Sequence, residues 1–433
     1  MFKAVAGYYK DNERLRLLVK IIAVWLISRA VMLLMVPVMN LIADEPHQWL
    51  YYMNPWDAEW YKGIVENGYQ PPKSSGMASW AFFPLYPLVC MAVRLVTMGS
   101  IDTYAVGMTV SNICIIIAVY YAVKYADIEL DMKKYNKKTV EDILIFLMLA
   151  GPFAVYYGAM YTEALFILCV ILCFYNSARH NYMAAGIAAA MASATRIVGC
   201  MLVFVLITYM FMETCAECRA KHNSEMKDNK EAGIIDKYML TDEAGIMLAG
   251  NISLASVIRT FIKNVIKEPK KLVAIMISPL GIFIYMNYLR YLCGDSWAFY
   301  HVQRAWRTQK MFPVIGVLFK SCTGQLTAAS GVKTLNGIIL GWLCVITLML
   351  YVAMIRKKHY ALGIFGIIVL LIPLTSSVMS TLRFIMGSFV IYIGVAEIIA
   401  GCNRYVRYGI IALLSIVEVV VISAWYFWDG LLM

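Results

Sequence analysis

Long apolar runs constrain the fold of this chain more than any other feature. They recur from residue 21 to the end, and several approach the roughly 20 residues that an α-helix needs to cross about 30 Å of hydrocarbon. They do not alternate between apolar and polar residues, as the strands of a membrane barrel do. With 61% hydrophobic and only 15% charged residues among 433, the chain is far more apolar than a soluble protein. We therefore predict an all-α polytopic membrane protein.

The basic residues predict how the chain is oriented in the membrane. The net charge is +11, and the Lys and Arg residues lie mainly between the apolar runs. The positive-inside rule explains this placement more simply than nucleic-acid binding does, so we expect no nucleic-acid partner. No small-residue cleavage site follows the first run. We expect a retained first helix and a cytoplasmic N-terminus, in the plasma membrane of a bacterium or the endoplasmic reticulum of a eukaryote.

The same rule sorts the remaining runs. Residues 84–98 would reach only about 22 Å as a helix, and counting them as a span would place the basic segment 133–138 outside. We interpret them as a surface helix within one external loop, residues 43–102. Residues 183–212 form either one long span or two short ones hinged at 195–199; two spans keep the later basic clusters inside and make 213–271 a solvated cytoplasmic loop with some amphipathic helix. The prediction is about eleven helices: 21–41, 103–125, 143–157, 164–177, two within 183–212, 272–292, 335–354, 361–378, 384–400 and 408–427.

This topology brings three polar segments to the outer face. The first lies in the external loop, the second is the turn 156–163, and the third is the segment 294–310. Their candidate residues are Trp56, Asp57, Glu59, Trp60 and Tyr61; Tyr161, Thr162 and Glu163; and His301, Arg304, Arg307 and Lys310. The aromatic residues fit either a substrate site or an interfacial belt.

Several charged residues have a functional and a simpler interpretation. Arg304 and Arg307 share a helix face and suit a phosphate, or they contact anionic headgroups. Glu163 opens an apolar run, where an unpaired charge is costly, although a helix N-terminus also accommodates an acid. Arg196 and Arg383 lie at apolar runs, where ionisable residues are functional candidates. Arg29 either snorkels towards the cytoplasm or forms an ion pair.

Metal and cofactor motifs are missing from the sequence. Neither His301 alone nor the single CxxC pair, Cys215 and Cys218, makes a metal site. There is no HExxH, GxSxG or Walker-type loop. We expect no metal and no obligatory cofactor, although paired carboxylates leave room for a divalent cation.

Four segments in order carry a resemblance to a known family: WDAEWYKGIVENGY with FFPLYPL, GPFAVYYGAMYTEALFIL, ATRIVG, and GDSWAFYHVQRAW. They resemble the PIG-V (GPI mannosyltransferase 2) group and its bacterial relatives, among the polyprenyl-phosphate-sugar-dependent glycosyltransferases of the GT-C fold. The resemblance covers most of residues 20–310, a GT-C catalytic module, and thins out over the C-terminal helices, 311–433. It implies acidic residues at Asp57 and Glu163, and a surface helix in the first external loop. ATRIVG departs from the family's Thr-Arg-Pro at Ile197 but keeps Arg196.

The residues and the resemblance together lead to a functional hypothesis. The chain transfers a hexose, most readily mannose, from a polyprenyl-phosphate donor to a hydroxyl of a lipid-linked or surface acceptor on the external or luminal face, with inversion. Asp57 is the general base, and Glu163 is the second catalytic carboxylate. Donor phosphate is assigned to Arg304, Arg307, His301 and Arg383, and substrate contacts to Trp56, Glu59, Trp60, Tyr61, Tyr161, Thr162 and Arg196. A transporter or flippase of lipid-linked sugars, or a non-catalytic membrane subunit, are the alternatives.

Overall fold

The described part of the chain is built from helices. The computed structural model describes residues 12–43, 48–231, 253–305, 313–325, 334–375, 378, 380–427 and 432, and these residues form helices and connections without a strand. The predicted all-α class is confirmed. Residues 306–312, which include Arg307 and Lys310, lie outside the described residues.

Five stretches are long and apolar enough to cross a membrane, counting only described residues. They are α2 (Glu13–Ile42), α6 (Thr103–Glu129), η3 (Ile197–Met201) with α10 (Leu202–Glu231), α16 (Thr334–Arg356) and α20 (Arg404–Tyr426). Two bent pairs would make seven: α12 (Pro269–Ile277) with α13 (Leu280–Cys293), and α18 (Thr381–Gly387) with α19 (Val390–Gly401). The chain is an integral membrane protein, and the number of eleven crossings stays a prediction.

Helix α8 (Glu163–Ala178) lies at the centre of the bundle. Most of its residues are buried, and it packs against α6, α9 (Tyr182–Ser193), α10 and α18. Close packing here depends on Gly107 of α6, where an added Cβ would lie 2.2 Å from Cγ of Met160. Three further helices complete this part of the fold: α7 (Lys137–Leu149), α15 (Val314–Cys322) and α17 (Tyr360–Leu374). The core therefore holds the start of α8 in a fixed position.

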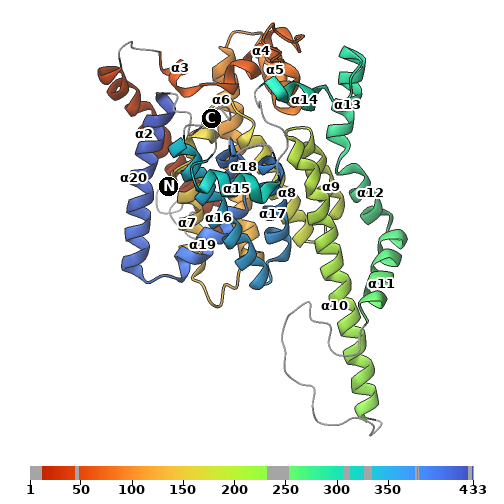
Figure 1. The fold of residues 1–433 in the computed structure, drawn as a ribbon. Coiled ribbons are helices and arrows are strands. Elements are labelled where there is room, and N and C mark those ends of the chain that lie inside the picture. The colour runs from red at the N-terminus through yellow and green to blue at the C-terminus, as the bar shows by residue number, and fades with distance from the viewer. Residues whose placement is uncertain are drawn as a thin grey trace, which may run out of the picture.

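Short elements gather at one end of the bundle, at the top of Figure 1. They are α3 (Trp49–Met53), α4 (Asp57–Asn67), η1 (Ser79–Ala81), α5 (Leu85–Val96), α14 (Ala298–His301) and η4 (Val302–Ala305). Helix α5 has 12 residues, or about 18 Å, so it is too short to span the hydrocarbon. It packs on α4 and α6, which agrees with the prediction that residues 84–98 are not a span.

The structure corrects several predicted boundaries. The run 143–157 is not one helix: α7 ends at Leu149, because Gly151 and Pro152 follow, and η2 (Ala154–Tyr157) comes after the break. The run 384–400 is not one straight span, since α18 and α19 meet at a 70° bend. The polar loop 213–271 is largely helical where described, because α10 continues to Glu231 and α11 (Leu254–Lys267) follows. Helix α15 was not expected. The predicted break within 183–212 is confirmed, with α9 and α10 separated by η3.

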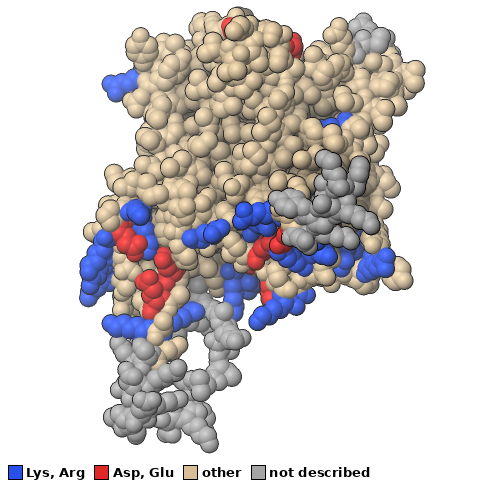
Figure 2. Space-filling model, turned by 180° about the vertical axis from the view of Figure 1, so that it is seen from behind, with Lys and Arg blue, Asp and Glu red and all other residues tan. Residues whose placement is uncertain are grey.

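Charged residues are distributed unevenly along the bundle. Figure 2 shows Lys and Arg gathered towards one end, opposite the short elements. This asymmetry is what the positive-inside rule leads us to expect, with the basic end cytoplasmic. The short elements α3, α4, α5 and α14 would then lie on the external face.

Candidate active site

Asp57 is the first residue of α4, and a strained turn places it there. Trp56, just before the helix, has φ 47° and ψ −102°, a backbone conformation that non-glycine residues rarely adopt. Such a conformation costs about 1–3 kcal/mol and persists only when the surroundings enforce it. The Tyr161 hydroxyl enforces it by donating to the Pro55 carbonyl at 2.7 Å and accepting from the Asp57 amide at 3.3 Å. The turn at residue 161 thus fixes where α4 begins.

Glu163 is the first residue of α8 and is buried, only 1% exposed. The turn before it is tied to the α3–α4 connection, because the Met160 amide donates to Oδ1 of Asn54 at 2.7 Å. Asp57 and Glu163 both begin helices, where the N-terminal dipole favours a negative charge. The first residues of two helices therefore supply the two carboxylates of the site.

Arg383 joins these two carboxylates into one cluster. Its Nη1 lies 2.5 Å from Oδ2 of Asp57, and its Nε lies 2.6 Å from Oε1 of Glu163. Arg196 also contacts Oε1 of Glu163, through Nη1 at 2.8 Å. Two carboxylates and two guanidiniums balance in charge, which a mostly buried cluster requires. We call Asp57, Glu163, Arg196 and Arg383 the ion cluster.

Aromatic rings surround both arginines. The Arg383 guanidinium lies 4.9 Å from the centre of the Tyr161 ring, and Arg196 lies 4.9 Å from that of Phe384. Such contacts hold a guanidinium plane in place. Arg383 sits in the first turn of α18, whose preceding residue, Ser380, has a left-handed φ of 62°. A cation at a helix N-terminus is unfavourable by itself, and the two carboxylates offset that effect.

The two acids of the ion cluster differ in exposure. The side chain of Asp57 is 25% exposed, whereas that of Glu163 is 1% exposed. Glu163 accepts bonds from both arginines and from Thr162, whose Oγ1 lies 3.4 Å from Oε2. Glu163 is thus enclosed by protein partners, and Asp57 is the acid that a substrate can reach.

The other predicted residues of α4 have varied surroundings. The buried Tyr61 hydroxyl donates to Thr162 Oγ1 at 3.4 Å, and burial raises the pKa of Tyr61, so its proton is retained. Trp60 stacks on Phe82 with 5.6 Å between ring centres and contacts Lys73. Both partners belong to the same loop region, so Trp60 stabilises that region. Glu59 is exposed and forms no ion pair with any described residue.

The described part of the segment 294–310, residues 294–305, does not join the ion cluster. His301 is exposed and lies 2.6 Å from the carboxylate of Asp295; this hydrogen bond lowers the pKa of Asp295. Arg304 is exposed and has no hydrogen bond to the cluster. Of the residues predicted to bind donor phosphate, the structure brings Arg383 to the two acids, and Arg307 lies outside the described residues.

Sequence reasoning missed part of the site's wall. Trp425 of α20 is fully buried and packs against Trp56, Tyr156 and Tyr161, with ring centres 5.4, 4.7 and 5.4 Å away. Asn54 was also missed. The only signal for Asn54 was that it is a polar residue just before the WDAEWY motif. Trp425 lies in the aromatic end of the last apolar run, which is typical of an ordinary interfacial belt.

Arg29 was predicted either to snorkel or to form an ion pair, and in the structure it makes hydrogen bonds to neutral groups. Its Nε donates to Oδ1 of Asn112 at 2.7 Å, and its Nη1 lies 3.4 Å from the carbonyl of Ala154. A Cβ on Gly158 would lie 3.3 Å from its guanidinium carbon. Arg29 therefore supports the backbone of the 154–158 turn, which leads to Tyr161 and Glu163.

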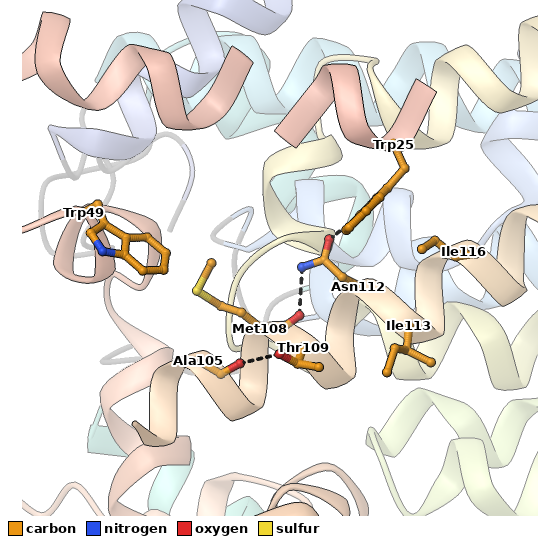
Figure 3. Close-up of a pocket in the computed structure, with 8 residues that line it drawn as sticks. All are labelled: Trp25, Trp49, Ala105, Met108, Thr109, Asn112, Ile113 and Ile116. Atoms are coloured by element: carbon orange, nitrogen blue, oxygen red, sulfur yellow. Dashed lines mark hydrogen bonds between the residues drawn. The ribbon is translucent and has the colours of Figure 1, made fainter. Parts of the chain in front are cut away.

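A separate groove of about 340 Å³ lies between α2, α3 and α6. Figure 3 shows Trp25 and Trp49 on its walls, with Trp25 donating to Asn112 Oδ1 at 2.7 Å. Most of its lining is apolar. It is distinct from the ion cluster, whose members come from α4, α8, α18 and the connection between α9 and η3.

Within the described residues, no three His, Cys, Asp or Glu side chains are grouped so that they could hold a metal ion. Asp57 and Glu163 instead contact guanidinium groups. The arrangement combines an accessible carboxylate, Asp57, with the guanidinium of Arg383 2.5 Å away, so it can remove a proton and stabilise an anion in one place.

Residues 15–232, just over half of the chain, match the family Mannosyltransferase (PIG-V). The chain belongs to this family. The predicted resemblance to the PIG-V group is confirmed. The match includes Asp57, Glu163 and Arg196 and ends before Arg383. No curated protein matches the sequence.

Three solved structures of the oligosaccharyltransferase from Archaeoglobus fulgidus are similar in arrangement. One carries a tethered acceptor peptide, with 13% identity, a TM-score of 0.47 and 97% of this chain covered. Another, AglB with an inhibitory peptide and a dolichol-phosphate, has 11% identity, a TM-score of 0.46 and 98% coverage. The apo form has 13% identity, a TM-score of 0.43 and 93% coverage. This chain spans 56% of the length of each.

Proposed function

We propose that this PIG-V family member transfers a hexose, most readily mannose, from a polyprenyl-phosphate donor to a hydroxyl of a lipid-linked or surface acceptor. The observation that carries the proposal is Arg383, which bonds Asp57 at 2.5 Å and Glu163 at 2.6 Å in a membrane protein of a mannosyltransferase family. A partly exposed acid held beside fixed cations is suited to proton removal and phosphate stabilisation in one step.

Asp57 is the general base of the proposed reaction. Its Oδ2 is bound to Arg383, and its Oδ1 makes no hydrogen bond to any described residue. The acceptor hydroxyl gives its proton to Asp57 as its oxygen forms a bond to the anomeric carbon. The bond from that carbon to the phosphate oxygen breaks, and the lipid phosphate leaves with the electron pair. A single displacement of this kind inverts the anomeric configuration.

The arginines of the ion cluster stabilise the leaving phosphate. Arg196 uses Nη1 on Glu163, and the other N–H groups of its guanidinium make no hydrogen bond to described residues. Arg383 is 9% exposed on its side chain and lies on the same carboxylate. Guanidinium forks match phosphate geometry, and Glu163 keeps both forks in position. Arg304 and Arg307, on the external segment, are the alternative phosphate site.

The test is transfer of radiolabelled mannose by the purified protein, given polyprenyl-phosphate mannose and a membrane lipid extract. Asp57→Asn should keep the folded state, measured by thermal unfolding, and lose about 10²- to 10⁴-fold in rate. Asp142→Asn is the matched control, because Asp142 is an aspartate of α7 that is 61% exposed and lies outside the ion cluster; it should stay near wild type. Near wild-type transfer by Asp57→Asn would refute the assignment. Movement of lipid-linked sugar across vesicles without any glycosylated product would favour a transporter.

A further inference from the structure

Helix α11 (Leu254–Lys267) presents three adjacent stripes along its length. One is turned inward, with Val257 and Val265 buried and Phe261 partly buried. The next is apolar and exposed: Ile258, Ile262 and Ile266 are 42%, 51% and 64% exposed. The third is basic and exposed, formed by Arg259, Lys263 and Lys267. Residues four apart share a helix face, so each stripe is continuous.

The inner stripe fixes α11 against α10. Phe261 meets Phe211 of α10 with 5.7 Å between ring centres, and Asn264 Nδ2 donates to Glu217 Oε2 at 2.9 Å. Figure 1 shows α11 beside α10 and directly before α12. Helix α12 begins at Pro269, two residues after α11 ends, and opens the first bent apolar pair. The exposed stripes therefore stand next to the start of a membrane span.

The basic stripe has no counter-charge in the described protein. Arg259, Lys263 and Lys267 form no ion pair with described residues, and Lys270 just beyond is exposed as well. By contrast, Lys271 at the same junction is buried and paired with Glu213 and Glu268, at 3.2 and 2.8 Å. The stripe thus offers several uncompensated cations beside an exposed row of isoleucines.

We propose that α11 docks on the membrane surface and binds anionic lipid headgroups. The isoleucine stripe enters the boundary between headgroups and acyl chains, and the basic stripe, about 100° around the helix, contacts lipid phosphates. A helix with one apolar and one basic face next to a span is suited to this position. Each cation adds to the attraction for an anionic leaflet, whereas the isoleucines bind any leaflet. This surface is separate from the ion cluster and does not depend on the reaction.

The experiment is hydrogen–deuterium exchange of the full-length protein in two nanodiscs, one of phosphatidylcholine and one with phosphatidylglycerol added. Amides of residues 257–266 should exchange about ten-fold more slowly in the anionic bilayer. The triple variant Arg259→Gln, Lys263→Gln, Lys267→Gln should lose this difference. The control variant Lys133→Gln, Lys134→Gln, Lys138→Gln changes two basic residues of the α6–α7 connection and one in the first turn of α7, and it should keep the difference.

Two outcomes would overturn the proposal. Equal exchange of residues 257–266 in the two wild-type nanodiscs would show that lipid charge does not act on α11. A triple α11 variant that keeps the lipid-dependent difference would assign that difference to other residues. Thermal unfolding of each variant shows whether it is folded. If the triple variant is not folded, the comparison of the wild-type protein in the two nanodiscs tests the proposal by itself.

Discussion

Two polar clusters lie along α6 and use carboxylates differently. The turn that carries Glu163 of the ion cluster contacts the N-terminal half of α6, where the Ser111 hydroxyl donates to the Tyr161 carbonyl. The second cluster lies at Glu129, at the other end of α6, 18 residues and about 27 Å further along the helix. There Glu129 accepts from Tyr125 and Tyr209 at 3.0 and 3.2 Å and pairs with His359 at 2.8 Å. Glu397 nearby binds Tyr135 and Lys357, each at 3.0 Å.

The difference lies in the accessibility of the acids, because positive-φ residues occur at both clusters: Trp56 and Ser380 at the first, and Lys358 at the second. Each carboxylate of the second cluster is at most 14% exposed, and its partners are mainly tyrosine, histidine and lysine. The ion cluster has an acid that is 25% exposed and two guanidiniums beside its carboxylates. Burial of a carboxylate alone therefore does not identify an active site in this protein.

The largest expected effect is at Glu163. Glu163→Gln removes the charge on which Arg196 and Arg383 converge, and breaking a buried ion pair costs about 3–5 kcal/mol. We expect the thermal unfolding temperature in detergent to fall strongly and mannose transfer to be lost. An unfolding temperature equal to wild type would show that Glu163 is not the anchor of the cluster.

Arg383→Lys tests the fork between the two acids. A lysine keeps the charge but cannot bond both carboxylates with a rigid fork. We expect transfer to fall about 100-fold, with a smaller loss of stability. Arg304→Lys, on the exposed external segment, is the control and should keep most activity. A greater loss for Arg304→Lys would move the phosphate site to that segment.

Arg29→Ala removes the support beneath the 154–158 turn. Because Arg29 touches neither acid, we expect turnover to fall only about ten-fold, with little change in KM. Trp25→Phe, which removes another donor to Asn112 but no contact to the turn, should have a smaller effect. Kinetics of the two variants, measured per folded protein, give the comparison; equal turnover would rule out this role.

The smallest effect on transfer is expected at the second cluster. Glu397→Gln removes a charge that is 5% exposed and bonds Tyr135 and Lys357. We expect a loss of about 1–3 kcal/mol in stability, and unchanged turnover, because its partners lie at the far end of α6. If Glu397→Gln abolished transfer in folded protein, the distinction between the two clusters would fail.

Local sequence patterns predicted much of the helical framework. The apolar runs predicted α2, α6, α16 and α20, and the family motifs predicted Asp57 and Glu163. The bends were not predicted, because run length does not show where Ser388 and Phe389 interrupt a helix. The sequence assigned donor phosphate to Arg304, Arg307, His301 and Arg383, and that assignment stays a prediction. The structure adds that Arg196 and Arg383 are the arginines that contact the acids.

The sequence by itself determined the membrane class and the family, and it predicted the two acids, because apolar length and motif order are properties of short segments. Only the tertiary structure decided which cations those acids meet. Arg383 lies 326 residues from Asp57 and 220 from Glu163 along the chain. It reaches them because α18 packs on α8, and that packing depends on side-chain shape across the whole bundle rather than on any local pattern.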